Sequence, residues 1–399
     1  MTSTNSSSNL YADSGPRMAQ QGQRIGEIRA LIGARALPPL LLVLFHYHEG
    51  HGYQHFRPFD VFVAKGYLWV EFFFALSGFV LVLVYGARKF SYGEFLKARL
   101  ARLYPLQLAT LLIMLAMMAF FGWLAAMNGT VSMYHQLYYH PYATWQSFIA
   151  NLFLVQAWHL FPQLSWNGVS WFVSVEFFLC LIFPLYLWLS RGGVLRAFIL
   201  ILIGFAALKY MADHSHHGLD ITYDYGIVRG MADFAVGVGM AMLYRQFKSR
   251  ADALSEHSLS AIQIVAAILF LYAIYDTGWS HNPRDFWIVP PMLAMVFALS
   301  FDRGIIARAL QARPLMRLGE WSFAVYMGQS VWLQLLHYNG PLPALPPALP
   351  PALAANLHWI EPVLLVIVCA GWGALLYWAI EKPANRALRG LFLRGTRPA

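Results

Sequence analysis

Long apolar stretches separated by short polar ones run along the chain from residue 37 to residue 380. Each holds about 17–25 residues with few charges, the length that an α-helix needs to cross a bilayer. Helices that are apolar on every side are too numerous here for one soluble core. The pattern predicts an all-α polytopic membrane protein with about ten transmembrane helices. The expected spans are 37–52, 66–86, 106–126, 171–190, 195–211, 226–244, 260–276, 287–301, 319–337 and 361–380.

Three other segments complete the expected organisation. The apolar stretch 145–161 is too short to span, so we expect an interfacial or re-entrant segment. The loop 340–359 repeats PPAL and is expected to be a stiff, polyproline-like spacer. We expect a disordered polar N-terminus over 1–24, a membrane domain over 25–388 and a basic cytoplasmic tail over 389–399.

The distribution of charge fixes the expected orientation. The net charge is +9, which by itself would also suit a nucleic-acid-binding protein. With the N-terminus inside, however, all but five of the 28 Lys and Arg residues fall in or beside cytoplasmic segments. This asymmetry is the positive-inside rule, so both termini are expected in the cytoplasm and no nucleic acid is expected as a partner. The five exceptions are Arg57, Lys65, Lys209, Arg229 and Arg284.

The first span carries an ionisable residue deep in apolar sequence. Arg35 and His46 are eleven residues apart, so on an ideal helix they share a face about 16 Å apart along the axis. An ionisable group inside a membrane indicates a functional site, although a histidine bonded to a backbone carbonyl explains the sequence equally well. Pro38 and Pro39 suit a first turn rather than a helix interior, and Arg35 is then outside the helix.

Histidines continue after this span, at spacings that could suit a metal. No fixed helical face collects all four of them, and no cysteine accompanies them. The two cysteines of the chain lie in apolar spans and suggest neither a disulfide nor a zinc site. We therefore expect an external loop and no metal site. The histidines are His46, His48, His51 and His55.

Two further spans contain buried polar residues with a structural interpretation. Glu71 is expected to pair with a histidine or arginine on another span, and Ser77 is a small residue suited to close helix packing. Arg229 and Asp233 are spaced i and i+4, so we expect them to pair with each other.

A basic cluster precedes the third span. It contains Lys97, Arg99 and Arg102, and Pro105 is expected in the first turn of the helix that follows. Two interpretations stay open. The cluster anchors the protein to anionic lipid, or its guanidinium groups bind the phosphates of a cytoplasmic cofactor.

The fourth span opens on a polar group at its external entrance, where Trp171, Ser174 and Glu176 lie together. A carboxylate there can orient a histidine or transfer a proton. The alternative is a residue that only hydrogen-bonds between helices.

Together these stretches resemble the acyltransferase 3 family, the multi-span O-acyltransferases that modify bacterial surface sugars. The resemblance covers about residues 25–388. One departure is Gln329, which stands where the family commonly has a histidine, and others are Pro38 and Pro39 after the arginine. The matching elements are R-x₁₀-H (Arg35, His46), the stretch from Gly66 to Phe79, R-x-x-R-x-x-P (Arg99, Arg102, Pro105), the stretch from Ser170 to Pro184, and Y-x-x-x-E-x-P (Tyr377, Glu381, Pro383).

The resemblance implies transfer of an acyl group, most often acetyl, from cytoplasmic acyl-CoA to a saccharide hydroxyl. It places the protein in the bacterial inner membrane, with acetyl-CoA or another acyl-CoA as co-substrate and no permanently bound cofactor. It also allows the polysaccharide assembly machinery as a partner, besides the lipid bilayer. The residues it implies are His46 as general base, Glu176 to orient it or relay the proton, Arg35, Arg99 and Arg102 for the donor phosphates, and Glu71, Ser77, Trp171 and Ser174 in support.

Two other functions are compatible with the same pattern. A proton-coupled exporter of a saccharide or small metabolite would also use intramembrane Glu and His, but the two halves show no repeat. A scaffold subunit of a polysaccharide synthesis complex would not need His46. The acyl group and the acceptor stay open, and exopolysaccharide, lipopolysaccharide, an oligosaccharide and a macrolide are all compatible with the family.

Overall fold

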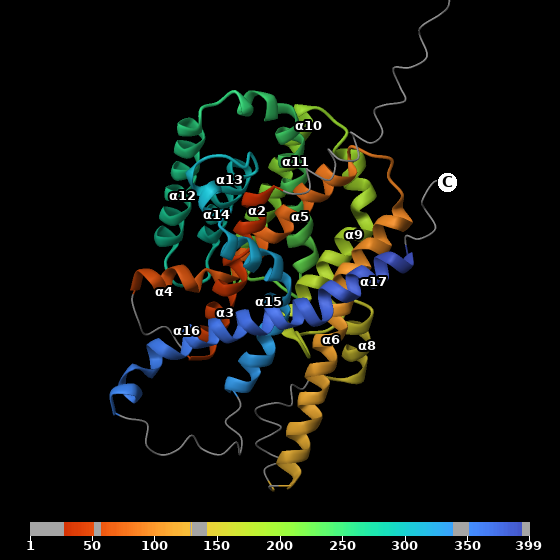
Figure 1. Cartoon of the computed structure of the whole chain (residues 1–399), viewed down its shortest axis with the longest axis vertical. Coiled ribbons are helices and arrows are strands. Elements are labelled where there is room, and N and C mark those ends of the chain that lie inside the picture. Colours follow the sequence, from red (N-terminus) through yellow and green to blue (C-terminus); the bar gives the residue numbers. More distant parts are fainter. Residues whose placement is uncertain (1–27, 52–56, 128, 130–141, 338–350, 393–399) are drawn as a thin grey trace, which may run out of the picture.

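The computed structural model describes residues 28–51, 57–127, 129, 142–337 and 351–392. This part of the chain is helical throughout and contains no strand, which confirms the all-α prediction (Figure 1). Eight helical segments are long and apolar enough to cross a membrane, so the prediction of a polytopic membrane protein is also confirmed. These segments are Arg29–Glu49, Gly66–Tyr85, Tyr92–Met127, Gly168–Leu189, Val194–His214, Gly226–Asp252, Glu256–Thr277 and Ile360–Phe392.

Most helices begin and end close to the expected spans. The two expected spans outside these eight segments correspond to α13, which has only 11 residues, and to α15, whose first half is charged. In chain order the elements are α2 (Arg29–Ala34), α3 (Leu37–His51), α4 (Arg57–Ala64), η1 (Gly66–Leu68), α5 (Trp69–Tyr85), α6 (Tyr92–Met127), α8 (Trp145–Leu152), η2 (Gly168–Ser170), α9 (Trp171–Leu189), α10 (Val194–His214), α11 (Gly226–Asp252), α12 (Glu256–Thr277), η3 (Pro283–Ile288), α13 (Val289–Leu299), α14 (Ile305–Leu310), α15 (Arg313–His337), α16 (Pro351–Leu376), η4 (Tyr377–Glu381) and α17 (Lys382–Phe392).

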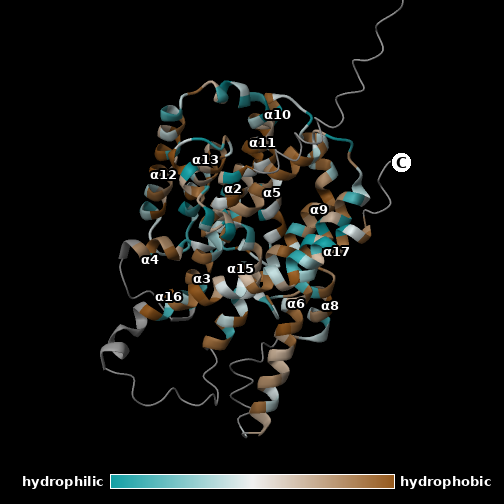
Figure 2. Cartoon of the chain, in the orientation of Figure 1, coloured by the Kyte–Doolittle hydropathy of each residue, from teal (hydrophilic) through white to brown (hydrophobic). Residues whose placement is uncertain are grey.

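Helices α5 and α11 form the centre of the bundle, and small residues bring them together. A Cβ atom added to Gly237 would lie 1.9 Å from the backbone oxygen of Ala75, and one added to Gly78 would lie 2.4 Å from that of Phe234. Only glycine permits this approach of two backbones, a common device between membrane helices. The outer helices α10 and α12 instead expose many large apolar side chains, as a lipid-facing surface requires (Figure 2).

The first span is not one continuous helix. Helix α2 ends at Ala34, Arg35 caps it, and α3 starts at Leu37 with Pro38 and Pro39 in its first turn. Proline lacks the N–H that a helix interior needs, so the chain restarts its helix here. Of the two arrangements that the sequence left open, the one with Arg35 outside the helix is found, and Arg35 lies in the turn between two helices.

Two other proline-based expectations also differ from the structure. Helix α6 already begins at Tyr92, so Pro105 lies in its interior rather than in its first turn. Helix α16 begins at Pro351, so residues 351–359 of the expected polyproline loop are helical. The rest of that loop that we expected to be stiff, 340–350, lies outside the described residues.

The ends of the chain are only partly described. The expected disordered segment 1–24 and residues 393–399 lie outside the described residues. The first residues of the expected tail, from Arg389, belong to α17, which continues to Phe392. The cytoplasmic location of both termini stays a prediction from the positive-inside rule.

Candidate active site

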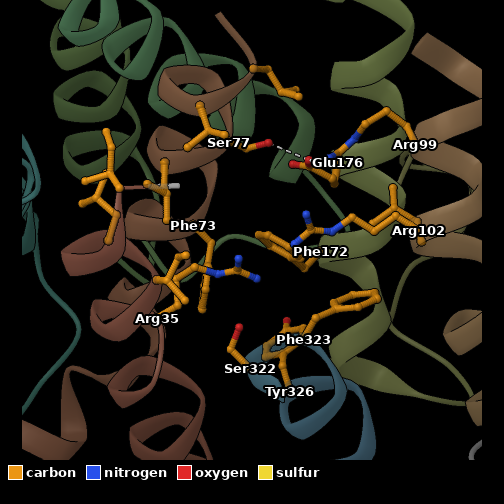
Figure 3. A pocket seen from close by; sticks show the side chains of 17 residues that line it. Arg35, Phe73, Ser77, Arg99, Arg102, Phe172, Glu176, Ser322, Phe323 and Tyr326 are labelled. Carbon is orange, nitrogen blue, oxygen red and sulfur yellow. Dashed lines mark hydrogen bonds and ion pairs between the residues drawn. The ribbon is translucent and has the colours of Figure 1, made fainter. Parts of the chain in front are cut away.

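Three arginines that are far apart in the sequence line one small cavity of about 190 Å³, which we call the arginine cavity (Figure 3). Arg35 enters from the turn after α2, and Arg99 and Arg102 enter from α6. The cavity is walled by aromatic side chains on the remaining helices. Its other lining residues include Phe73 and Ser77 on α5, Phe172 and Glu176 on α9, and Ser322, Phe323 and Tyr326 on α15.

Glu176 neutralises one of the three guanidinium groups. Arg99 donates from Nη2 to Oε1 of Glu176 in a buried ion pair. The Ser77 hydroxyl donates to the same oxygen at 2.6 Å. Oε2 of Glu176 is buried and has no hydrogen-bond partner among the described residues. Ser77 is thus a partner of Glu176, in addition to being small enough for a packed helix.

The other two guanidinium groups are free. Arg35 and Arg102 have no hydrogen-bond or ion-pair partner in the part of the chain that the structure describes, and they lie close enough to repel each other. The carboxylate of Glu381 acts electrostatically on both, and its Oε2 is buried without a partner among the described residues. Unpaired cations that are partly withdrawn from water are costly, so this arrangement is suited to a bound anion such as a phosphate.

Glu381 is a buried carboxylate that acts electrostatically on Arg35 and Arg102, and the sequence indicated it only through the motif Y-x-x-x-E-x-P. It ends the π-helical turn η4, which interrupts the helix formed by α16 and α17. Such turns often occur at functional sites because they redirect a side chain. The signal in the sequence was the motif, but nothing there connected Glu381 with Arg35 and Arg102.

A second, larger cavity of about 880 Å³ contains His46, and we call it the histidine cavity. Its walls are formed mainly by aromatic and polar side chains rather than by apolar ones. Among its lining residues are His46, Glu49, Tyr67, Trp166, Trp171, His217, Asp220, Thr222, Tyr223, Arg229, His281, Tyr326, Ser330 and Gln334.

His46 is held by a carboxylate of its own helix. Nδ1 of His46 lies 3.1 Å from Oε2 of Glu49, three residues further along α3. A carboxylate only accepts hydrogen bonds, so the proton of the neutral imidazole is on Nδ1 and Nε2 keeps a free lone pair. That tautomer suits a general base. Sequence reasoning missed Glu49, although its i, i+3 spacing from His46 was visible.

The structure does not bring the predicted pair of His46 and Glu176 together. Glu176 lines the arginine cavity and is held by Arg99 and Ser77, whereas the carboxylate beside His46 is that of Glu49. The physical reason is that Glu176 is near enough to an arginine on α6 to form a buried ion pair, which fixes its side chain. Tyr326 lines both cavities, and its hydroxyl donates to the Val169 carbonyl at 2.8 Å.

Glu71 pairs with an arginine on another helix, as predicted, but that arginine is Arg229. Two parallel hydrogen bonds of 3.0 and 2.8 Å join the guanidinium to the carboxylate. The expected pair of Arg229 and Asp233 is therefore wrong, because the guanidinium of Arg229 is bonded to Glu71 on α5 instead. Both carboxylate oxygens of Asp233 are buried without a hydrogen-bond partner among the described residues.

The remaining predicted residues support the walls of the histidine cavity. The ring of Trp171 lines it and lies 5.7 Å from the guanidinium carbon of Arg229. Ser174 accepts from the Ala157 amide at 3.2 Å and donates to the Leu154 carbonyl at 2.8 Å. These bonds hold the segment after α8, an eight-residue helix too short to cross a membrane, against α9.

Two further expectations concern Gln329 and the run of histidines. Gln329 is fully buried and donates to the Tyr326 carbonyl at 3.0 Å, outside the lining of both cavities. Among the side chains that the structure describes, no group of three or more His, Cys, Asp or Glu is placed to hold a metal ion. The side chains of His51 and His55 lie outside the described ones.

Comparison with known proteins identifies one family and two relatives. The family model described as an acyltransferase domain matches residues 28–379. Acyltransferase MdmB of Streptomyces mycarofaciens is 28% identical over 347 residues, which cover 81% of this chain and 82% of that protein. Protein 2 in picA locus of Rhizobium radiobacter is 41% identical over 90 residues, 22% of this chain and 43% of that protein. No solved structure matches.

Proposed function

The chain belongs to the acyltransferase 3 family, and from this premise we propose that it moves an acetyl or other acyl group from cytoplasmic acyl-CoA to a saccharide hydroxyl. It is a membrane acyltransferase. Its donor, its acceptor and its place in the bacterial inner membrane are part of the proposal.

The arginine cavity supports the donor part of the proposal. Coenzyme A carries several phosphate charges, and Arg35 and Arg102 offer two guanidinium groups that no protein carboxylate bonds. Guanidinium groups bind phosphate through two parallel hydrogen bonds.

The histidine cavity supports the acceptor part. His46 Nε2 takes the proton of the acceptor hydroxyl while the hydroxyl oxygen attacks the thioester carbon. The carbon–sulfur bond breaks, the ester carbon–oxygen bond forms, and the coenzyme A thiolate receives the proton that His46 accepted. Glu49 stabilises the imidazolium between these two steps, because its carboxylate lies 3.1 Å from Nδ1.

One observation carries the proposal: the two cavities share Tyr326 as a lining residue. A thioester entering from the arginine cavity and a hydroxyl bound in the histidine cavity can meet only where the two cavities adjoin. Reactants held next to each other react faster than free ones by large factors.

The test is acyl transfer by the purified protein in lipid nanodiscs, with radiolabelled acetyl-CoA and a saccharide acceptor. His46→Gln is expected to lower kcat at least about a hundredfold by removing the base, and Arg35→Ala is expected to raise the KM for acetyl-CoA. The matched control is His214→Gln, which changes an exposed histidine at the end of α10.

Normal transfer by His46→Gln would overturn the role of His46. An unchanged KM for acetyl-CoA in Arg35→Ala would overturn the donor site. Export of a saccharide by the wild-type protein without any acyl transfer would favour the exporter instead.

A further inference from the structure

We propose that the histidine cavity selects an acceptor that carries a protonated amine, as an amino sugar does, and that Asp220 on its wall binds this amine. The inference names the acceptor class of the proposed function and rests on it. It follows from the charges, the geometry and the aromatic residues of the cavity.

The cavity wall has more negative than positive fixed charge. Glu49 and Asp220 line it, and Arg229 is the only Lys or Arg among its described lining residues. Arg229 is already neutralised by two hydrogen bonds to Glu71. Behind the wall, Lys65 is neutralised by Asp285 at 2.6 Å. Two carboxylates therefore face the cavity with histidines, His46 and His281, as their direct partners among the described residues.

The internal segments that the structure does not describe add no lysine or arginine. By sequence, the internal segments 52–56, 130–141 and 338–350 contain neither Lys nor Arg. An acceptor with a carboxylate or phosphate would meet like charge in this cavity, which disfavours its binding. An acceptor with a positive charge would supply the missing counter-ion.

Asp220 is positioned to be that binding group. It lies in the loop between α10 and α11, and this loop is fixed by a 2.9 Å hydrogen bond from Arg229 to the Ile221 carbonyl. Oδ2 of Asp220 lies 3.4 Å from Nε2 of His281. Its side chain is 27% exposed, so the carboxylate remains accessible from the cavity.

The environment keeps Asp220 ionised. Burial alone would raise its pKa, but the close approach of His281 and the charge of Arg229 together lower the pKa of Asp220 below the ordinary value. His46 and Asp220 line the same cavity, and His46 acts electrostatically on Asp220. An amine held by Asp220 would therefore keep the sugar in the cavity that contains the base.

Aromatic rings complete the expected site for an ammonium group. Such rings attract cations through their faces, and aromatic cages with carboxylates are a common way to bind an ammonium group. A neutral sugar would also stack on these rings, but it would bring no positive charge to either carboxylate. The rings in the wall belong to Tyr67, Trp166, Trp171, Tyr223 and Tyr326.

The test compares three methyl glycosides that differ at one position: a hydroxyl, a dimethylamino group or a carboxylate. A tertiary amine cannot form an amide, so all transfer from acetyl-CoA goes to oxygen. For the wild-type protein in nanodiscs at pH 7, we expect kcat/KM for the dimethylamino acceptor to exceed that for the neutral one at least about tenfold, as one charge-assisted hydrogen bond predicts. We expect the carboxylate acceptor to be the poorest.

Asp220→Asn is expected to abolish the preference for the amine. The matched control is Asp213→Asn, which removes a carboxylate that is paired with Lys209 on α10 and does not line the cavity. This control is expected to keep the preference.

Competition with the wild-type protein gives a second readout that needs no variant. The dimethylamino glycoside should inhibit transfer to the neutral one at lower concentration than the carboxylate glycoside does. Equal use of the three acceptors, or an amine preference that persists in Asp220→Asn, overturns the inference while acyl transfer itself stands. Absence of transfer to every acceptor overturns the proposed function instead.

Discussion

Glu49 shows how a single side chain decides what His46 can do. Without an acceptor at Nδ1, the imidazole would exchange between two tautomers, and only one of them leaves Nε2 free as a base. In the proposed mechanism the carboxylate at 3.1 Å selects that tautomer and would stabilise the positive charge that develops when Nε2 takes a proton. Glu49 would act through His46, as a positioning residue.

Glu49→Gln is expected to lower kcat by about tenfold to a hundredfold and to leave the KM values nearly unchanged. The amide is neutral and no longer stabilises the imidazolium, while the shape of the cavity is kept. Steady-state kinetics of acyl transfer in nanodiscs measures both constants. Glu49→Asp is the matched control, because it keeps the charge, and should recover part of kcat. A rise in KM without a change in kcat would instead make Glu49 a substrate-binding residue.

At the scale of elements, the contact between α5 and α11 sets the positions of polar residues in the candidate site. Gly78 and Gly237 let the two backbones approach, and this approach places Glu71 beside Arg229. Arg229 in turn fixes the loop that carries Asp220 through the Ile221 carbonyl. The packing of two apolar helices therefore sets the position of polar groups in the histidine cavity.

Gly237→Ala is expected to destabilise the protein by about 1–3 kcal/mol, because the added methyl group would overlap the Ala75 carbonyl and force the helices apart. The control is Gly371→Ala on α16, where an added Cβ has no neighbour within 4 Å. Alanine there is expected to be neutral or to stabilise the helix by up to about 1 kcal/mol. Thermal unfolding in detergent measures the difference, and equal melting temperatures for the two variants would contradict the packing argument.

At the scale of the whole molecule, the chain surrounds two cavities of different chemistry, and Tyr326 lines both of them. The arginine cavity is lined from α2, α6 and α9, and the histidine cavity from α3 and the loop before α11. The positive-inside distribution predicts that the first opens toward the cytoplasm and the second away from it. The acyl group would then cross part of the membrane within the protein.

Single cysteines test this arrangement. Ile32→Cys lies in the wall of the arginine cavity and Thr222→Cys in the wall of the histidine cavity. A membrane-impermeant maleimide is expected to label Thr222→Cys from outside and Ile32→Cys only in inside-out vesicles, and acyl-CoA should slow labelling of Ile32→Cys alone. The wild-type chain is the control, because Cys180 and Cys369 are both fully buried. Labelling of both variants from the same side would contradict the predicted orientation.

The sequence by itself determined the class of the molecule. The length of the apolar stretches is set by the thickness of a bilayer, so all-α spans follow from composition alone. The order of the motifs indicated the family and the arginines and histidine of the site. Pro38 and Pro39 already marked the end of one helix and the start of the next. Proline fixes its own φ angle and lacks a backbone N–H, and both effects are independent of the tertiary structure.

Only the tertiary structure decided which residues meet. Arg229 had a carboxylate one turn away at Asp233, yet it pairs with Glu71 on another helix. Glu176 had no predicted arginine partner, and it pairs with Arg99. The carboxylate that contacts His46 is therefore that of Glu49. Such choices depend on how helices rotate and tilt against each other, and that is set by packing between distant segments. A linear sequence does not state this packing, which also places Tyr326 in the lining of both cavities.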